Sequence, residues 1–308
     1  MVRVFICCKS RCVLWAYTSK AQYIMNIESQ YLDLVKTVLQ NGIYTDERTG
    51  TGTIAIPHAM ISHDMSNGFP IMTTKKIAWK TLKVELEGFI KGVTDKTWFK
   101  DRGCRIWDEW CNPMLVPSWL ESEERKEFQL QERRLGPIYG YQWRQFGNSK
   151  TVRGVDQLQR VLDTLIKNPN DRRMLVSAWN PQDLDQMALP PCHYAWQVSV
   201  IGGKLHLCWN QRSCDLGLGI PYNIASYALL LMLLAKHAGL EPGTLTGFLT
   251  NVHIYKNHVE PLKLQLTRTP FDFPTLKLTN VDFLSWDHTK ASLVGYRHCP
   301  VIPMAVAV

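Results

Sequence analysis

The thiol of Cys192 is the group in this sequence best suited to covalent chemistry. It lies in the run from Leu189 to His193 (LPPCH), where two prolines restrict the backbone before it and a histidine follows it. The thiolate is the reactive form of cysteine, so a catalytic role requires positive charge or hydrogen-bond donors near by. The alternative is a small buried side chain with no chemical role, which is the commoner use of cysteine.

Two segments could bind a phosphate through arginine. The hydroxyl-rich loop from Asp46 to Thr53 (DERTGTGT) carries Arg48, and the run from Gln211 to Asp215 (QRSCD) carries Arg212 next to Ser213. A guanidinium group can bind a phosphate through two parallel hydrogen bonds. The loop lacks the spacing of a P-loop, so ATP is not implied, and either segment could instead be a plain surface turn.

A further pair of arginines, Arg172 and Arg173, precedes the apolar run from Met174 to Trp179. Neighbouring residues of a strand point to opposite faces, so the two guanidinium groups could serve different partners. The alternative is a solvated start of a strand.

Three polar side chains could recognise a nucleoside. The amide of Asn223 can accept a hydrogen bond from uracil N3–H while it donates one to O4, although Asn223 could instead cap the helix that follows it. His253 and Tyr255 are two residues apart, so in a strand they share a face and could hold a sugar hydroxyl.

Glu85 is a candidate carboxylate with a raised pKa. Residues Thr81 to Lys91 are predicted to form a helix with Leu82, Leu86 and Phe89 on one apolar stripe, and Glu85 falls on that stripe. Burial disfavours the charged form of a carboxylate. The alternative is that Glu85 reaches water or pairs with a lysine.

The elements that must position these residues are both helices and strands. Helices are predicted over Gln30 to Leu39 and over Asn223 to Ala238, the second buried on most sides and ended by Gly239. A hairpin is predicted from Trp196 to Trp209, with its turn at Gly202-Gly203. Because no regular βαβ rhythm is present, we expect a single α+β domain from Met25 onward.

Composition is that of an ordinary globular protein. Hydrophobic residues make up 45% and charged residues 20% of the chain. The net charge of +8 comes from scattered basic residues, which favours phosphate or carboxylate ligands. Nine cysteines without a CxxC pair predict reduced thiols in the cytoplasm, with neither a disulfide scaffold nor a metal site. The apolar stretch from Ile224 to Ala235 is too short to span a bilayer.

Two segments are expected to lie outside the regular fold. Residues 1 to 24 are basic and contain no acidic residue, which fits a targeting peptide. The alternative, which we favour, is a disordered extension or an upstream start with Met25 as the functional first residue. The charged run 118–127, within an irregular region at 111–134, predicts a solvated helical insertion.

Taken together, these segments resemble thymidylate synthase, the folate-dependent family that methylates dUMP. The likeness runs from about Met25 to Val308 outside the insertion. The matching motifs, in chain order, are DERTGTGT (46–53), IWDEW (106–110), GPIYGYQWR (136–144), DRRMLVSAWN (171–180), MALPPCH (187–193), QRSCD (211–215) and GIPYNIASY (219–227).

The resemblance implies a role for each candidate. It implies a mixed sheet packed by helices, in an obligate homodimer whose subunits meet sheet to sheet, with dUMP and 5,10-methylenetetrahydrofolate as substrates and no metal. The nucleophile would be Cys192, with Glu85, Tyr139, His193 and Asn223 completing the catalytic network. The dUMP ligands would be Arg48, Arg212, Ser213, Asp215, Asn223, His253 and Tyr255, with Arg172 and Arg173 donated by the neighbouring subunit. The folate side would comprise Lys75, Trp107, Asp108, Leu189, Asp215, Gly219 and Tyr222, closed by Val308.

Several departures from the family pattern leave a second activity open, the hydroxymethylation of dUMP. Water must be excluded from the site before hydride transfer if a methyl group is to form. In this sequence Glu87-Gly88 replaces the usual Leu-Trp pair, Thr250-Asn251 replaces Gly-Asp, and Ala78 and Tyr222 also differ. Loss of bulk at Gly88 could loosen the water barrier, but the other aromatic and apolar residues favour the synthase.

A nucleic-acid-binding protein is the alternative from a different class. The net charge of +8 and eleven tryptophans suggest it. The tryptophans fall mostly in apolar strands or in the motifs above, so RNA binding is kept only as a second activity, which would show a steep salt dependence.

Overall fold

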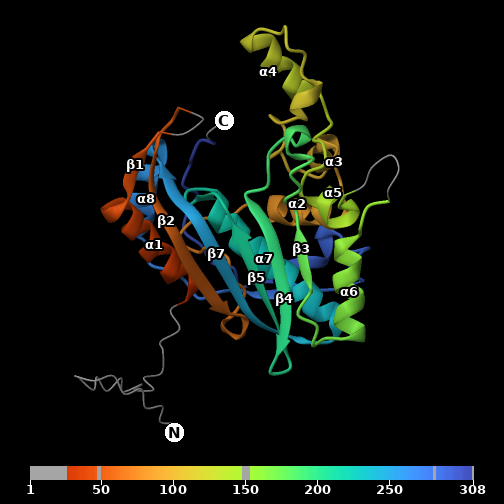
Figure 1. The fold of residues 1–308 in the computed structure, drawn as a ribbon. Coiled ribbons are helices and arrows are strands. Elements are labelled where there is room, and N and C mark those ends of the chain that lie inside the picture. The colour runs from red at the N-terminus through yellow and green to blue at the C-terminus, as the bar shows by residue number, and fades with distance from the viewer. Residues whose placement is uncertain (1–25, 47–49, 148–152, 280–281, 307–308) are drawn as a thin grey trace, which may run out of the picture.

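A mixed β-sheet runs through the middle of the fold (Figure 1). The computed structural model describes residues 26–46, 50–147, 153–279 and 282–306. The strand order is β1-β2-β7-β5-β4-β3, with β6 also paired to β7. The strands are β1 (Ile43–Thr45), β2 (Thr53–Asp64), β3 (Leu175–Ser177), β4 (His193–Ile201), β5 (Lys204–Gln211), β6 (Cys214–Asp215) and β7 (Glu241–Tyr255). All neighbours are antiparallel except β5 and β6, which run parallel to β7.

Helices pack on one face and around the edges of this sheet (Figure 1). A small second sheet pairs β8 (Thr275–Leu278) with β9 (Ala291–Val294). The helices are α1 (Ile27–Asn41), α2 (Trp79–Lys91), α3 (Lys96–Asp101), α4 (Ser122–Gln131), α5 (Tyr139–Gln145), α6 (Gln157–Lys167), α7 (Gly219–Ala238) and α8 (Val259–Leu266). The α+β class with a mixed sheet is therefore confirmed.

One row of inward-facing residues joins the sheet to the helices. The strand register aligns Val176, Trp196, Trp209, Gly247 and Ile61 across five strands, and all five are buried. A Cβ atom at Gly247 would overlap the indole of Trp209, so only glycine lets this ring lie against the neighbouring strand. The same indole stacks on Tyr227 of α7, with ring centroids 5.4 Å apart.

The helix α7 forms the centre of the core. By length and composition its 20 residues are apolar enough to cross a membrane, but 67% of its most apolar window is buried inside the fold. It is therefore a core helix. Gly239 ends it in the left-handed conformation (φ 67°), as predicted.

The predicted elements are present, with differences at their ends. The helix predicted at 30–39 is the middle of α1, and the one predicted at 81–91 is most of α2. Gly202 and Gly203 both have positive φ and turn the chain between β4 and β5, which confirms the hairpin. The helix predicted from Asn223 begins earlier, at Gly219, with Leu218 as its N-cap residue. Asn223 lies inside the first turns of α7, so its interpretation as a cap is wrong.

The region 111–134 contains an exposed helix, although α4 spans Ser122–Gln131 and the prediction was 118–127. Figure 1 shows α4 projecting away from the body of the fold, and none of its residues is buried. Its first turn is stabilised by a capping box between Glu121 and Glu124. Residues 1–24, predicted to be an extension, lie outside the described residues.

Candidate active site

A large cavity of about 1980 Å³ opens beside the carboxyl ends of β5 and the start of α7. Most of the residues singled out from the sequence line it, although they come from segments far apart in the chain. Those residues are Glu85, Trp107, Asp108, Tyr139, Leu189, Cys192, His193, Arg212, Ser213, Asp215, Gly219, Tyr222, Asn223, His253 and Tyr255.

Cys192 lies in this cavity among hydroxyl groups and one guanidinium group. Its backbone N–H donates to the hydroxyl oxygen of Tyr139 at 2.8 Å. Burial raises the pKa of the Cys192 thiol, while the charge of Arg212 and hydrogen bonds from Tyr139 and Ser213 oppose that effect. The thiol is thus protonated before a ligand binds, and it must lose its proton to act as a nucleophile.

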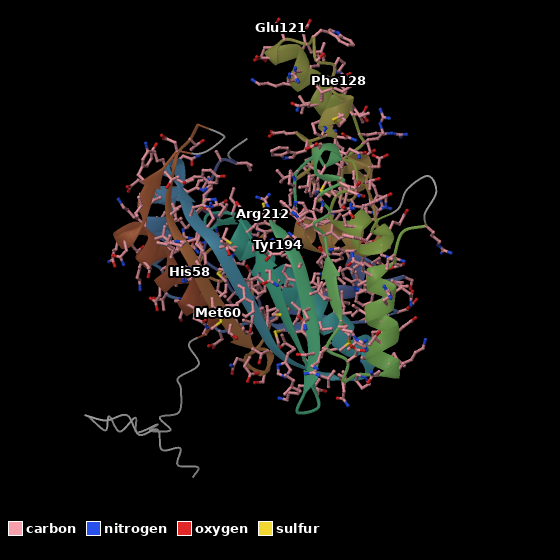
Figure 2. The ribbon with its side chains drawn as sticks, in the orientation of Figure 1. His58, Met60, Glu121, Phe128, Tyr194 and Arg212 are labelled. Atoms are coloured by element: carbon pink, nitrogen blue, oxygen red, sulfur yellow. The ribbon has the colours of Figure 1, made fainter. Side chains whose placement is uncertain are left out.

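Arg212 is held by the two backbone carbonyls that directly precede the cysteine. Its Nε and an Nη donate to the carbonyls of Pro191 and Pro190, each at 2.9 Å, and its guanidinium carbon lies 5.2 Å from the ring centroid of Trp179. Figure 2 labels Arg212 at the end of the central strands. These bonds fix the group and leave its remaining N–H donors for an anion.

His193 is a neutral imidazole in this site. Burial lowers its pKa to about 3. The ring stacks on Tyr139 with centroids 4.3 Å apart, and Nδ1 forms a hydrogen bond of 2.8 Å with the hydroxyl of Tyr227. His193 therefore orients its neighbours and does not supply the positive charge that would stabilise a thiolate.

Glu85 has the raised pKa that its place on the apolar stripe predicts. Burial raises the pKa of this carboxyl to about 7, against a smaller opposite effect of a hydrogen bond from Trp107 Nε1 at 3.1 Å. A carboxyl with a pKa near neutrality can both release and accept a proton at physiological pH. The alternative, a carboxylate paired with a lysine, is not what the structure shows.

The side-chain amide of Asn223 is oriented by a chain of hydrogen bonds from Trp209 through Gln211. The indole Nε1 of Trp209 donates to Gln211 Oε1 at 3.1 Å, and Gln211 Nε2 then donates to Asn223 Oδ1 at 3.0 Å. An indole N–H can only donate, so it orients the amide of Gln211, which in turn orients that of Asn223. Gln211 was not singled out as a site residue, although it begins the QRSCD motif that carries Arg212.

His253 and Tyr255 share a face of β7, as predicted. Their rings are in edge-to-face contact with centroids 5.2 Å apart. His253 Nδ1 donates to the backbone oxygen of Asn251 at 2.9 Å. Asn251 itself has φ 52°, a left-handed conformation that asparagine adopts more readily than most residues.

Part of the cavity wall suits a flat aromatic ligand. Trp107, Leu189 and Tyr222 present apolar surface to the cavity, and Asp108 and Asp215 add acceptors. A pterin-type ring needs such apolar walls with a few polar groups that fix its orientation. The residues present therefore fit the folate co-substrate that the resemblance implies.

Lys75 does not line the cavity with the other residues of the folate side. It is buried, and its ammonium group donates to the carbonyl oxygen of Gly217. Burial lowers the pKa of Lys75 to about 8, while the charge of Asp215 opposes this shift. Lys75 supports the loop that leads into α7.

Of the four remaining candidates, the structure describes two, and neither of them lines this cavity. Arg172 and Arg173 are exposed and absent from its lining, and Arg173 forms a surface ion pair with Asp171 at 2.7 Å. Arg48 and Val308 fall outside the described residues. No group of three or more His, Cys, Asp or Glu side chains in the described part of the chain is arranged to hold a metal ion.

Fold and site together define an α+β enzyme with a cysteine thiol, a guanidinium group and a carboxyl of raised pKa around one large cavity. Residues 29–308 match the family model described as thymidylate synthase. The chain is 42% identical to the thymidylate synthase of equine herpesvirus 2 over 298 residues, which cover 92% of this chain and 100% of that protein. It is 42% identical to the human thymidylate synthase over 293 residues (91% of each chain) and 43% identical to that of Mycoplasma genitalium over 291 residues (91% and 99%). The chain belongs to the thymidylate synthase family, whose members are folate-dependent methyltransferases.

Proposed function

We propose that this chain converts dUMP to dTMP, with 5,10-methylenetetrahydrofolate as co-substrate and dihydrofolate as the second product. The observation that carries the proposal is the arrangement around Cys192. One cavity holds a cysteine thiol, an amide oriented for a uracil edge and a carboxyl whose pKa is about 7. The relatives that match over most of the chain are named thymidylate synthase.

The chemical step begins at the sulfur of Cys192. The thiolate adds to C6 of uracil, and the electrons of the C5–C6 double bond move towards C5 and O4, which makes C5 nucleophilic. Tyr139, Ser213 and Arg212 stabilise the sulfur anion as the proton leaves. When bound, the folate supplies the one-carbon unit and the hydride.

Asn223 and Glu85 act on the base. The Nδ2 group of Asn223 donates to O4, where negative charge develops, and its Oδ1 accepts from N3–H. Glu85 carries and releases protons near neutral pH because its pKa is about 7. His253 and Tyr255 hold the deoxyribose.

Hydroxymethylation of dUMP is not favoured by the contacts at Gly88. The sequence suggested that missing bulk there could admit water. A Cβ atom at Gly88 would overlap the ring of Phe99, so that the space beside this glycine is filled. The relatives named above also carry the name of the synthase and not of a hydroxymethylase.

The test is incubation with dUMP and methylenetetrahydrofolate, with dihydrofolate followed by absorbance and the nucleotide by mass. Dihydrofolate and dTMP are expected, and the Cys192→Ser variant should bind dUMP but give neither product, because an alcohol is a far weaker nucleophile. A hydroxymethyl product with tetrahydrofolate would refute the synthase, and turnover by Cys192→Ser would refute the covalent step.

The functional unit is a homodimer that forms through the uncovered face of the sheet. The register places Met60 and Phe248 opposite each other on this face, and they are 63% and 45% exposed. Figure 2 shows Met60 and His58 on β2, on the sheet face that none of the described helices covers. Leu175, 46% exposed, extends the apolar surface to β3. Exposed apolar side chains on a broad flat face are typical of a subunit interface.

A second copy would also complete the phosphate site. Arg172 and Arg173 are separated from β3 by one residue, lie at the edge of this face and do not line the cavity of their own chain. In a twofold arrangement each subunit donates this pair to the other, where it joins Arg212 and Ser213 at the phosphate.

Mixed dimers distinguish donation across the interface from a role within one subunit. Cys192→Ser subunits and Arg172→Ala/Arg173→Ala subunits are each expected to be inactive. Mixing them should restore activity to about a quarter of wild type, because half the dimers then contain one complete site. No recovery in subunits shown to have exchanged would refute donation, and a chain that sediments as a monomer would refute the dimer.

A further inference from the structure

The ring of Phe99 occupies the space that a side chain at position 88 would fill. Gly88 lies in α2 and is buried, and Phe99 reaches it from α3. An added Cβ at Gly88 would overlap Cε1 and Cζ of Phe99 and would lie 3.2 Å from Cδ1. Phe99 is fully buried. The two positions are therefore complementary: a large residue at 99 requires glycine at 88.

The same ring packs against the indole that binds Glu85. The ring centroids of Phe99 and Trp107 are 6.5 Å apart, and Trp107 also contacts Phe89 and Tyr139 at 6.4 and 6.3 Å. The Nε1 of Trp107 donates to Glu85 Oε1. Phe99 does not line the cavity, so any effect of it on the reaction must pass through a neighbour, either Trp107 or the helix α2 that carries Glu85.

We propose that Phe99 is a positioning residue, which takes the place left by Gly88 and holds the indole of Trp107 so that its N–H stays on the carboxyl of Glu85. A planar side chain wedged between α2 and the indole fixes the direction of that N–H better than a smaller one. This inference rests on the proposed function, because it assumes that Glu85 handles a proton in the reaction.

The experiment measures the pH dependence of kcat in Phe99→Leu, Gly88→Ala and the double variant. The Phe99→Leu variant frees the indole, so the pKa associated with Glu85 should rise by about one unit from its wild-type value. Its kcat should fall about tenfold, while KM for dUMP stays within about twofold. Gly88→Ala pushes the Phe99 ring and should also lower kcat. Leucine lacks the two atoms that the new methyl group would overlap, so the double variant should recover part of both losses.

The control is Phe283→Leu, a fully buried phenylalanine that contacts His237 and lies away from the cavity. It should lower the melting temperature to a similar extent as Phe99→Leu without moving the pH profile. A Phe99→Leu profile that coincides with that of Phe283→Leu, or fully multiplicative losses in the double variant, would overturn the inference.

A Glu85→Gln variant separates this inference from the proposed function. The pH transition that belongs to Glu85 should vanish in it. If Glu85→Gln keeps the wild-type profile, the proposed role of Glu85 fails. If Glu85→Gln loses the transition but Phe99→Leu leaves it in place, only the role of Phe99 fails.

Discussion

Replacing Asn223 by aspartate should redirect the enzyme from uracil to cytosine nucleotides. In the structure the amide of Asn223 is oriented by Gln211, which is itself oriented by the indole of Trp209. The Oδ1 atom is therefore the acceptor and Nδ2 the donor that a base meets, which matches uracil N3–H and O4. Cytosine presents the reverse pattern, an acceptor at N3 and a donor at N4.

The magnitude follows from the hydrogen bonds exchanged at Asn223. With aspartate, O4 of dUMP loses its donor inside a cavity, which costs about 1–3 kcal/mol. The amino group of dCMP gains a carboxyl acceptor, worth about 1.5–3 kcal/mol. Together these effects amount to about 2.5–6 kcal/mol, so the ratio of kcat/KM for dUMP to that for dCMP should fall by a factor of about 10² to 10⁴.

The assay compares both nucleotides in the wild type, Asn223→Asp and a matched variant, Gln211→Glu. Glutamate at 211 still accepts from Trp209 but no longer donates to Asn223, so the amide can rotate. Discrimination should then weaken, and by less than in Asn223→Asp. An unchanged ratio in Asn223→Asp would refute the role of Asn223 in reading the base, and an unchanged ratio in Gln211→Glu alone would refute the orientation by Gln211.

Three further predictions concern groups whose contacts are explicit. Tyr139→Phe removes the acceptor of the Cys192 amide and a donor to its thiol, so kcat should fall about a hundredfold; a rate within threefold of wild type would contradict this. Burial alone would raise the pKa of Glu87, but hydrogen bonds from Lys91 and His288 hold that pKa below the ordinary value for a glutamate. Its stabilising effect is therefore present above the unfolded-state pKa of about 4.3 and is lost as pH falls through the lower folded-state pKa. Glu87→Gln should thus lower the free energy of unfolding by about 2 kcal/mol at pH 7, and the variant should lose less stability than wild type on acidification. Urea unfolding from pH 3 to 7 measures both effects. Parallel curves of stability against pH for the two proteins would refute this role of Glu87. Glu28→Leu leaves the buried backbone amides of Thr73 and Thr74 without their acceptor. The free energy of unfolding should therefore fall by about 3 kcal/mol, while dUMP binding measured by calorimetry stays unchanged. A loss below about 1 kcal/mol would contradict the importance of this carboxylate.

The local parts of the fold could be predicted because their causes are local. The consecutive glycines Gly202 and Gly203 predict the turn of the hairpin between β4 and β5, and both have positive φ. Apolar spacing predicts α1, α2 and α7, although α7 begins four residues earlier than expected. Its first residues, Gly219 to Tyr222, include a glycine and a proline, which are signals of a turn as much as of a helix.

The long-range parts could not be predicted in the same way. The parallel pairing of β5 with β7 joins residues 204–211 to 241–249, and α7 lies between them in the sequence. Nothing in either strand specifies this partner or its register. The role of Gln211 could not be predicted for the same reason. It depends on hydrogen bonds to the indole of Trp209 in β5 and to the amide of Asn223 in α7, which is a contact between two elements.

The departures from the family pattern have partners in the structure, which changes how they should be interpreted. Gly88 makes room for Phe99, so lost bulk at one position is present at another. The hydroxyl of Tyr222 accepts a hydrogen bond from the backbone of Ala78 at 3.3 Å, which links two of the departures directly. Because Gly88 is compensated by Phe99, and Ala78 and Tyr222 contact each other, neither pair is by itself evidence for a different reaction.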